Sequence, residues 1–260
     1  MNIDLMKFYG KKLIILNQLN SEFDSINEFY EFKKAGFLNY NNAKIDKINL
    51  EDDFLGIHVF RDPRDLIVSA YFSHKYSHSA NSAWGENKLI HHRKKLVSLS
   101  LKKGLMEEIQ FSRKNIERIL SLFESSSKKI KHFKLEDIIK DNLFFYKEFL
   151  TFYSLGLKDS SFTLINQNIN FLLSKSPIDV NLKSFFFGRT KHITHKRLNA
   201  IVEKNNFKNL SGGRKKGEED KKSHFRKGIA GDWKNYFDKD VLAMFNEIYP
   251  NYVKRLGYQK

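Results

Sequence analysis

The chain has 260 residues, of which 41% are hydrophobic and 14% aromatic, so it can bury the core of one α/β domain and is not intrinsically disordered. It has no cysteine, which excludes disulfides, thiolate zinc sites and cysteine nucleophiles. The formal net charge of +16 predicts an anionic partner, such as a nucleotide, an acidic glycan, a nucleic acid or a membrane surface.

The first third of the chain mixes strand and helix signals. Residues 11–17 predict a short buried strand, and residues 26–34 predict an amphipathic helix. Residues 37–43 are rich in turn-forming residues and predict a connection. The clearest strand is residues 53–61, whose apolar end suits a parallel strand covered on both faces.

A tight turn and a helix follow that strand. Pro63 cannot continue a central strand but suits the first turn of a helix, with Asp62 as the N-cap. Residues 66–78 predict the body of this helix. Strand, tight turn and helix in this order form the arrangement in which a nucleotide phosphate meets the carboxyl edge of a parallel sheet.

The rest of the chain predicts mostly helices. Residues 79–105 are polar and basic and predict an irregular segment that faces a substrate. No segment is rich enough in Pro, Gly or Ser to separate two domains, so we expect one domain over residues 1–260. The other predicted elements are helices at 107–125, 140–156, 193–205 and 238–256, a strand at 129–135 and a loop at 209–227.

Arg61 and Ser69 form the first candidate anion site. Arg61 ends the predicted strand, and Ser69 lies about two turns into the helix that follows. A guanidinium and a hydroxyl placed in this way can converge on one phosphate group. The alternative is a surface Arg61 paired with Asp62 or Asp65, with Ser69 facing solvent, and spacing alone leaves both open.

Residues 226–237, RKGIAGDWKNYF, form the second candidate. Arg226 offers a planar fork of donors, Lys227 a point charge, and Gly228 a backbone N–H that no side chain shields from a phosphate oxygen. The preceding residues 204–227 are dense in Lys and Arg and favour a loop that closes over a polyanion. A solvated basic loop is the alternative. We interpret Trp233 as a core anchor for the base of the loop.

These two stretches, FRDPRDLIVSAYFSHKYSH and GRKKGEEDKKSHFRKGIAGDWKNYF, resemble the sulfotransferases that use 3′-phosphoadenosine 5′-phosphosulfate (PAPS). The resemblance implies a fold like that of the P-loop-containing nucleoside triphosphate hydrolases, with a central parallel sheet flanked by helices. It implies sulfuryl transfer from PAPS to a hydroxyl or amine acceptor, without a metal. It also implies that the donor's 3′-phosphate is bound by Arg61, Ser69, Arg226, Lys227 and Gly228.

Two shorter segments extend the resemblance. FKLED at residues 133–137 is similar to a strand end of the family, and KRLGY at residues 254–258 to its usual C-terminal segment. The resemblance therefore covers the chain from about residue 37 onward. The lack of cysteine fits a reducing compartment, and with no window apolar over the roughly 18 residues of a membrane span, we expect a cytoplasmic location.

The sequence departs from the family pattern in three places. No phosphosulfate-binding loop of the Lys-Ser-Gly-Thr-Thr type precedes Arg61, because Gly10-Lys11-Lys12 lacks hydroxyls and precedes a strand. No histidine lies in residues 37–43, where many members have a catalytic base, and Leu135 replaces a tyrosine near adenine. We therefore expect an N-terminally incomplete domain that lacks the first strand and the P-loop, binds 3′-phosphoadenosine groups weakly and transfers sulfate poorly or not at all.

The catalytic base is the least defined part of the site. His74 and His78 lie four residues apart on one helix face and are the candidates on the acceptor side, with solvent exposure as the alternative. No carboxylate lies near them in the sequence, so we expect no metal. We interpret His58, inside the predicted strand, as a core histidine.

Two other functions compete with sulfuryl transfer. One is a non-catalytic remnant of the family that binds a nucleotide or polyanion. The other is a nucleic-acid-binding module, but the aromatic residues are not interleaved with the basic runs and no helix-turn-helix or zinc pattern is present, so we expect no nucleic-acid partner. The positive charge of residues 79–105 and 204–227 favours an anionic glycan as the acceptor.

Overall fold

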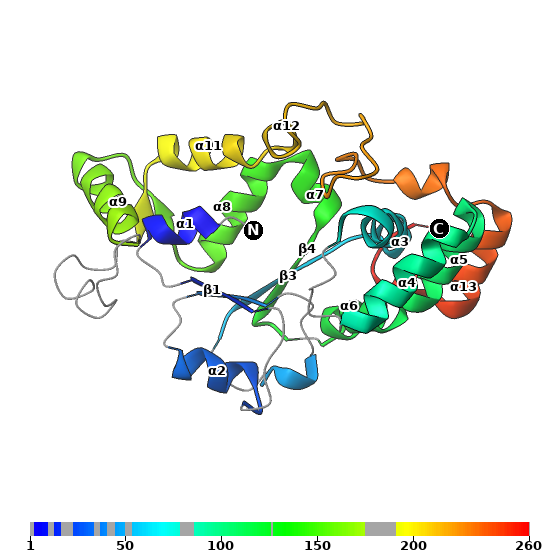
Figure 1. Ribbon diagram of the computed structural model, residues 1–260. Coiled ribbons are helices and arrows are strands. Elements are labelled where there is room, and N and C mark those ends of the chain that lie inside the picture. The colour runs from blue at the N-terminus through cyan, green and yellow to red at the C-terminus, as the bar shows by residue number, and fades with distance from the viewer. Residues whose placement is uncertain are drawn as a thin grey trace. The chain divides into compact units, whose positions relative to one another are not determined.

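The computed structural model describes residues 3–9, 13–16, 23–33, 37–40, 45–49, 54–78, 86–125, 127–174 and 191–259 (Figure 1). The chain divides into two compact units, and each unit takes two separate segments of the chain. The first unit comprises Met1–Leu55 and Asp141–Asn209, and the second comprises Gly56–Lys140 and Leu210–Lys260. No helix in the described part of the chain is long and apolar enough to cross a membrane.

The first unit contains two short parallel ladders. Strand β1 pairs with β2 from Leu13 opposite Phe37, and β5 pairs with β6 from Gly156 opposite His192. The connection predicted at residues 37–43 is therefore wrong for residues 37–40, which pair as a strand. The elements are α1 (Ile3–Phe8), β1 (Leu13–Leu16), α2 (Ile26–Phe32), β2 (Phe37–Tyr40), η1 (Ile45–Lys47), α8 (Asn142–Phe152), β5 (Gly156–Leu157), α9 (Ser161–Ser174), β6 (His192–Ile193) and α11 (His195–Lys204), with α12 (Phe207–Leu210) at the boundary.

The second unit is built on a parallel pair of strands. β3 and β4 pair from Gly56 opposite Ile130 to Phe60 opposite Lys134. All strand pairs among the described residues are parallel, as the predicted α/β fold requires. The elements are β3 (Gly56–Phe60), α3 (Pro63–Phe72), η2 (Ser73–Ser77, a π-helix), α4 (Glu86–Ser98), α5 (Leu101–Phe111), α6 (Arg113–Phe123), β4 (Ile130–Lys134), α7 (Leu135–Lys140), η3 (Asp232–Asn235), α13 (Lys239–Ile248) and α14 (Tyr252–Arg255).

Two predictions about this unit need correction. Residues 86–98 and 101–111 form helices α4 and α5 instead of an irregular segment, while residues 79–85 lie outside the described part. Buried Leu89, His92 and Leu96 give α4 its inward face at helical spacing, although most of its other residues are polar. The helix predicted at 107–125 is two helices that meet at Ser112.

The core of the second unit lies where α3, α5 and α13 pack together (Figure 1). Its centre includes Ile67, Ile109 and Phe245, all fully buried, and burial of each such side chain contributes roughly 1.5–3 kcal/mol. Helices α3 and α5 approach closely at Gly104, where an added Cβ would lie 2.5 Å from the ring of Tyr71. This packing fixes α3, which carries Ser69 of the candidate site.

Candidate anion-binding site

The turn before α3 forms as predicted. Asp62 is the N-cap, and its carboxylate accepts a hydrogen bond of 2.9 Å from the Arg64 backbone N–H. The same carboxylate forms an ion pair of 2.6 Å with the Arg64 guanidinium, which lies 3.9 Å from the centre of the Trp233 ring. Arg64 is therefore committed to the structure of the turn, and Arg61 is the arginine of this turn that remains for a ligand.

Arg61 is only loosely held. Its Nη2 lies 3.9 Å from Asp65 Oδ2, so the ion pair considered from the sequence is present but long. Its Nε–H is buried and has no hydrogen-bond partner among the described residues. Ser69 lies two turns further along α3 and is half-buried, so it does not face solvent fully. A buried donor without a partner is costly, and an anion at this position would remove that cost.

Asp65 joins the two candidate stretches. Its carboxylate accepts hydrogen bonds from the backbone N–H groups of Gly231 (2.6 Å) and Trp233 (2.8 Å). Burial raises the pKa of Asp65, and this effect exceeds the lowering by Arg61 and the two backbone hydrogen bonds. Trp233 packs against the core of the second unit, which confirms its predicted role as an anchor. The turn at residues 226–233 is thus fastened to α3.

Arg226 and Lys227 are paired with carboxylates. Arg226 binds Glu219 and Asp232, the latter at 2.5 Å, and Lys227 Nζ lies 2.7 Å from Asp232 Oδ1. The Arg226 guanidinium also lies 4.8 Å from the centre of the Phe72 ring of α3. Positively charged side chains of both stretches therefore lie against the same helix.

The backbone of the turn adopts the conformation that its glycines allow. Gly228 has a φ of 68° and Gly231 a φ of 76°, in the region that favours glycine. Arg214, which the sequence reasoning did not single out, donates to the carbonyl oxygens of Phe225 (2.6 Å) and Arg226 (2.9 Å). No local sequence signal distinguishes Arg214 from the other cations of the loop, because its role depends on how the loop folds back.

Asp232 and Glu219 are the carboxylates that pair with Arg226 and Lys227. Burial raises the pKa of Asp232, but hydrogen bonds from Lys227, Asn235 and Arg226 outweigh burial and lower it. Glu219 behaves in the same way, since hydrogen bonds from Tyr236 and Arg226 outweigh its burial. The side chain of Glu219 is 23% exposed, compared with 2% for Asp232. Glu219 is therefore the partner that an incoming anion displaces most easily.

The two catalytic candidates differ in environment. His74 is buried, and its Nδ1 lies 3.0 Å from Oε2 of Glu108, so solvent exposure is wrong for this residue. His78 is half-buried between the rings of His74 and His224. Burial, with the nearby charges of His74, His224 and Arg93, lowers the pKa of His78. Of the two side chains, His78 is therefore the more exposed one, whereas His74 is buried against Glu108.

Other sequence segments also meet in the second unit. Glu136 of the FKLED segment accepts hydrogen bonds from the Asp62 backbone N–H (2.9 Å) and the Tyr258 hydroxyl (2.8 Å). The strand end, the turn before α3 and the C-terminal segment are therefore linked. His58 is buried in β3, as interpreted from the sequence. Gly10-Lys11-Lys12 lies outside the described residues.

Comparison with known proteins identifies the family. The sulfotransferase domain model matches residues 49–257. The chain is similar to the crystal structure of mouse sulfotransferase SULT7A1 complexed with PAP, with a TM-score of 0.51, 16% identity, and coverage of 94% of this chain and 74% of that chain. Retinol dehydratase in complex with androsterone and inactive cofactor PAP gives a TM-score of 0.42 and 14% identity, covering 87% of this chain and 55% of that chain. A search of curated protein sequences finds no match. The chain belongs to the sulfotransferase domain family and has its α/β fold.

Proposed function

We propose that this protein is a sulfotransferase that binds PAPS through Arg61, Ser69, Arg226, Lys227 and Gly228. The observation that carries the proposal is the attachment of the Arg226–Lys227–Gly228 turn to α3 through Asp65. This attachment places the guanidinium of Arg226 against the helix that carries Ser69. The match of residues 49–257 to the sulfotransferase domain family supports the proposal.

The residues present fit a phosphate group. Arg61 has a buried Nε–H without a partner among the described residues, and Arg226 and Lys227 supply charged donors. Gly228, with its positive φ, presents a backbone that no Cβ shields. When bound, PAPS would supply the sulfuryl group, whose bond to the bridging oxygen breaks as a bond to the acceptor oxygen or nitrogen forms. His78 is the residue that we propose to take the proton of the acceptor.

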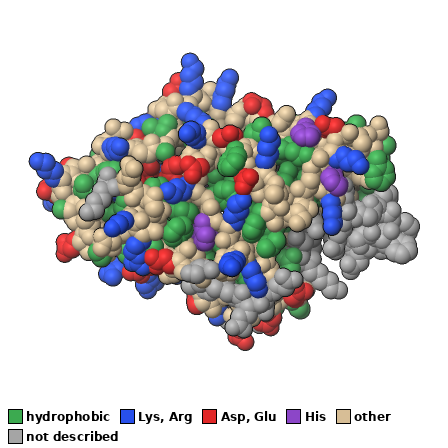
Figure 2. Space-filling model, turned by 180° about the vertical axis from the view of Figure 1, so that it is seen from behind, with side chains coloured by type: hydrophobic (Ala, Val, Ile, Leu, Met, Phe, Trp, Pro, Cys, Tyr) green, Lys and Arg blue, Asp and Glu red, His purple; other side chains and the backbone are tan. Residues whose placement is uncertain are grey.

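The large positive charge does not by itself indicate a nucleic-acid partner. On the face shown in Figure 2, Lys and Arg side chains are scattered among acidic and hydrophobic ones instead of forming one patch. A hydroxyl- or amine-bearing small molecule or an anionic glycan remains the acceptor class that we propose. Binding of a nucleotide or polyanion without transfer is the second candidate, because the residues of the proposed site account only for binding of the 3′-phosphate.

Calorimetry with two matched nucleotides tests the donor site. We expect the chain to bind adenosine 3′,5′-bisphosphate more tightly than adenosine 5′-phosphate, which lacks the 3′-phosphate. Arg226→Ala should weaken binding of the bisphosphate by about 1.5–3 kcal/mol, the scale of a hydrogen bond to a charged group. Lys222→Ala, which removes an exposed cation of the same loop, is the control. Equal affinity for both nucleotides, or no effect of Arg226→Ala, would contradict the proposed site.

A transfer assay separates the two candidate functions. PAPS is incubated with the chain and a set of phenol, alcohol, amine and glycan acceptors, and the bisphosphate product is measured. Product that depends on both acceptor and Arg226 supports sulfuryl transfer. Bisphosphate binding without product under any acceptor supports the non-catalytic candidate.

A further inference from the structure

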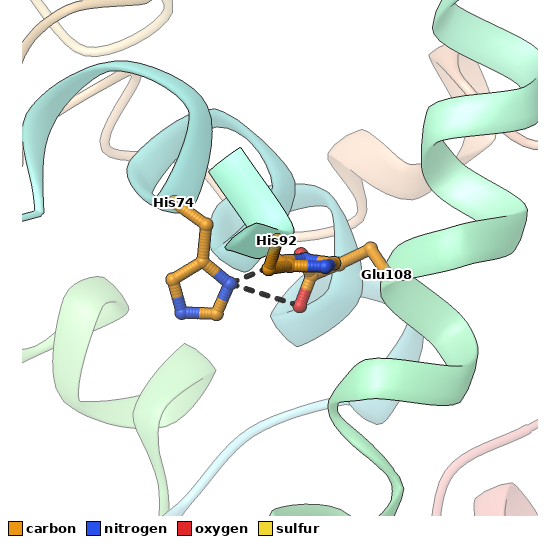
Figure 3. Close-up of side chains that lie close together, drawn as sticks. All are labelled: His74, His92 and Glu108. Atoms are coloured by element: carbon orange, nitrogen blue, oxygen red, sulfur yellow. Dashed lines mark hydrogen bonds and ion pairs between the residues drawn. The ribbon is translucent and has the colours of Figure 1, made fainter. Parts of the chain in front are cut away.

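Three side chains with metal-binding groups meet inside the second unit, and we call them the buried triad: His74, His92 and Glu108 (Figure 3). They come from η2, α4 and α5, so each lies on a different helix. All three are buried, with exposed fractions of 4%, 4% and 0%. None of the three belongs to the phosphate-binding turn, so the triad is a separate feature of this unit.

The geometry of the triad centres on one carboxylate. His74 Nδ1 lies 3.0 Å and His92 Nε2 lies 2.7 Å from the same oxygen, Glu108 Oε2. The Ser112 hydroxyl donates to the other oxygen, Oε1, at 2.6 Å. An ionised carboxylate can only accept hydrogen bonds, so each imidazole presents an N–H to it. Buried charges in proteins are either paired in this way or coordinate a metal.

The chemistry of the donor set matches a transition metal. Two imidazole nitrogens and one carboxylate oxygen are ligands typical of Zn²⁺ and neighbouring first-row ions, whereas Mg²⁺ and Ca²⁺ prefer oxygen alone. The ligand atoms lie within 4.8 Å of one another. Around a tetrahedral zinc ion, bonds of about 2.0–2.2 Å place ligand atoms roughly 3.3 Å apart. The two nitrogen–oxygen distances of the triad, 3.0 and 2.7 Å, are a few tenths of an ångström shorter than this spacing, so the three side chains hold an ion after a small rearrangement.

The surroundings hold these ligands in place. The Phe111 ring stacks on His92 with 3.6 Å between ring centres, and the Arg93 side chain donates to the backbone oxygen of His74 at 2.7 Å. His74 lies in a π-helical segment, a distortion that occurs frequently at functional sites. A surface hollow reaches one edge of the triad and gives an ion a route from solvent; its lining is Lys88, His91, His92, Lys95, Glu107 and Phe111.

We propose that His74, His92 and Glu108 bind one divalent transition-metal ion, such as Zn²⁺, which ties η2, α4 and α5 together. Each imidazole moves its proton to its other ring nitrogen and turns the freed lone pair to the ion, while Glu108 keeps its hydrogen bond from Ser112. Three protein ligands leave at least one coordination position for water. The sequence alone predicts no metal here, because Glu108 lies 34 residues from His74 along the chain. This proposal does not depend on the proposed sulfotransferase function.

Cobalt and zinc binding test the site on the full chain without a polyhistidine tag. We expect wild type to take up one Co²⁺ with the visible absorption of a nitrogen-ligated, four- or five-coordinate ion, and Zn²⁺ to displace it. His92→Gln keeps an N–H donor toward Glu108 but removes the ligand, and should weaken binding more than about 100-fold. His195→Gln, which removes an exposed histidine of the first unit, is the matched control and should bind as wild type does.

Two further measurements keep the test decisive. Ser112→Ala should weaken metal binding by about 10–100-fold, the usual effect of removing a group that orients a ligand. X-ray absorption at the zinc edge of wild type should show two imidazoles, and His74→Asn provides a second variant if His92→Gln does not fold. Failure of wild type to bind one ion per chain, or equal binding by wild type and His92→Gln, would show that the triad is only a hydrogen-bonded network.

Discussion

The phosphate-binding turn and the buried triad hold charged side chains in two different ways. In the turn, Arg226 shares its guanidinium between Asp232 and the partly exposed Glu219, so one partner can be exchanged for a ligand. In the triad, Glu108 is fully buried, and the partners that it shows are His74, His92 and Ser112. The turn can rearrange around an anion at modest cost, whereas the triad cannot lose a member without leaving buried polar groups unsatisfied. The same unit thus contains an exchangeable and a fixed arrangement of charge.

The largest difference between the two arrangements should appear on removal of Glu108. Glu108→Ala leaves His74, His92 and Ser112 without their acceptor in the core, and we expect a loss of about 3–5 kcal/mol in the free energy of unfolding. Glu107→Ala is the control. Its ion pair with Lys95 lies at the surface and should contribute less than about 1 kcal/mol. Urea unfolding in a chelator-containing buffer measures both, and equal losses would contradict the distinction.

His58 extends the comparison to a buried histidine that faces another imidazole instead of a carboxylate. His58 Nδ1 lies 3.1 Å from His132 Nδ1, and burial, with the charge of His132, lowers the pKa of His58 to about 4. The unfolded chain takes up this proton near pH 6.5, before the folded chain does. Stability from this group is therefore complete above about pH 6.5 and is lost as pH falls toward 4, by about 3 kcal/mol. Urea unfolding at several pH values measures the slope, which His58→Asn should reduce; an unchanged slope would exclude His58 as its source.

The link between the turn and α3 can be weakened without touching a cation. Asp65→Asn replaces an acceptor of two backbone N–H groups by an amide with only one acceptor oxygen. We expect a loss of about 1–3 kcal/mol in unfolding free energy, together with weaker binding of adenosine 3′,5′-bisphosphate. Asp137→Asn, at an exposed position of the same unit, is the control. Normal nucleotide binding by a folded Asp65→Asn chain would show that the turn does not depend on this link.

The smallest expected effect concerns the exchangeable partner. Glu219→Gln removes a carboxylate that competes with phosphate for Arg226, so nucleotide affinity should rise. Because this pair is partly exposed, the gain is about 0.3–1 kcal/mol, or roughly two- to fivefold. Glu218→Gln, whose carboxylate accepts from the backbone of Lys215, is the control in calorimetry. A fall in affinity for Glu219→Gln would instead mean that Glu219 positions Arg226 for its ligand.

The turn could be predicted from sequence because its determinants are local. Asp62 and Pro63 specify the start of α3, and the glycines at 228 and 231 specify backbone with positive φ. The strand–turn–helix segment and the Arg226–Lys227–Gly228 run could therefore be recognised from adjacent residues. How Asp65 would join them could not, because 166 residues separate Asp65 from Gly231.

The triad and the helices that carry it could not be predicted for the opposite reason. Helix α4 has a narrow buried face among many lysines and histidines. The helical spacing of its few buried residues is therefore a weak signal in a polar sequence. Only packing against α5 brings His92 to Glu108. Glu108 itself looks like one charged residue of an ordinary amphipathic helix. The burial of Glu108 results from the packing of three helices, so it cannot be predicted from the neighbouring residues in the sequence.

The division of each unit into two segments affects how the protein is made. The core of the second unit contains Ile67 and Leu105 from its first segment and Val241, Phe245 and Val253 from its second. During synthesis from the N-terminus, α3 to α6 therefore cannot complete this core until residues 141–209 and then α13 have been synthesised. Until then the part of their apolar surface that packs on α13 remains uncovered, and long-range closure of this kind is slow and exposes a chain to aggregation. Premature termination before α13 would leave the second unit without one wall of its core.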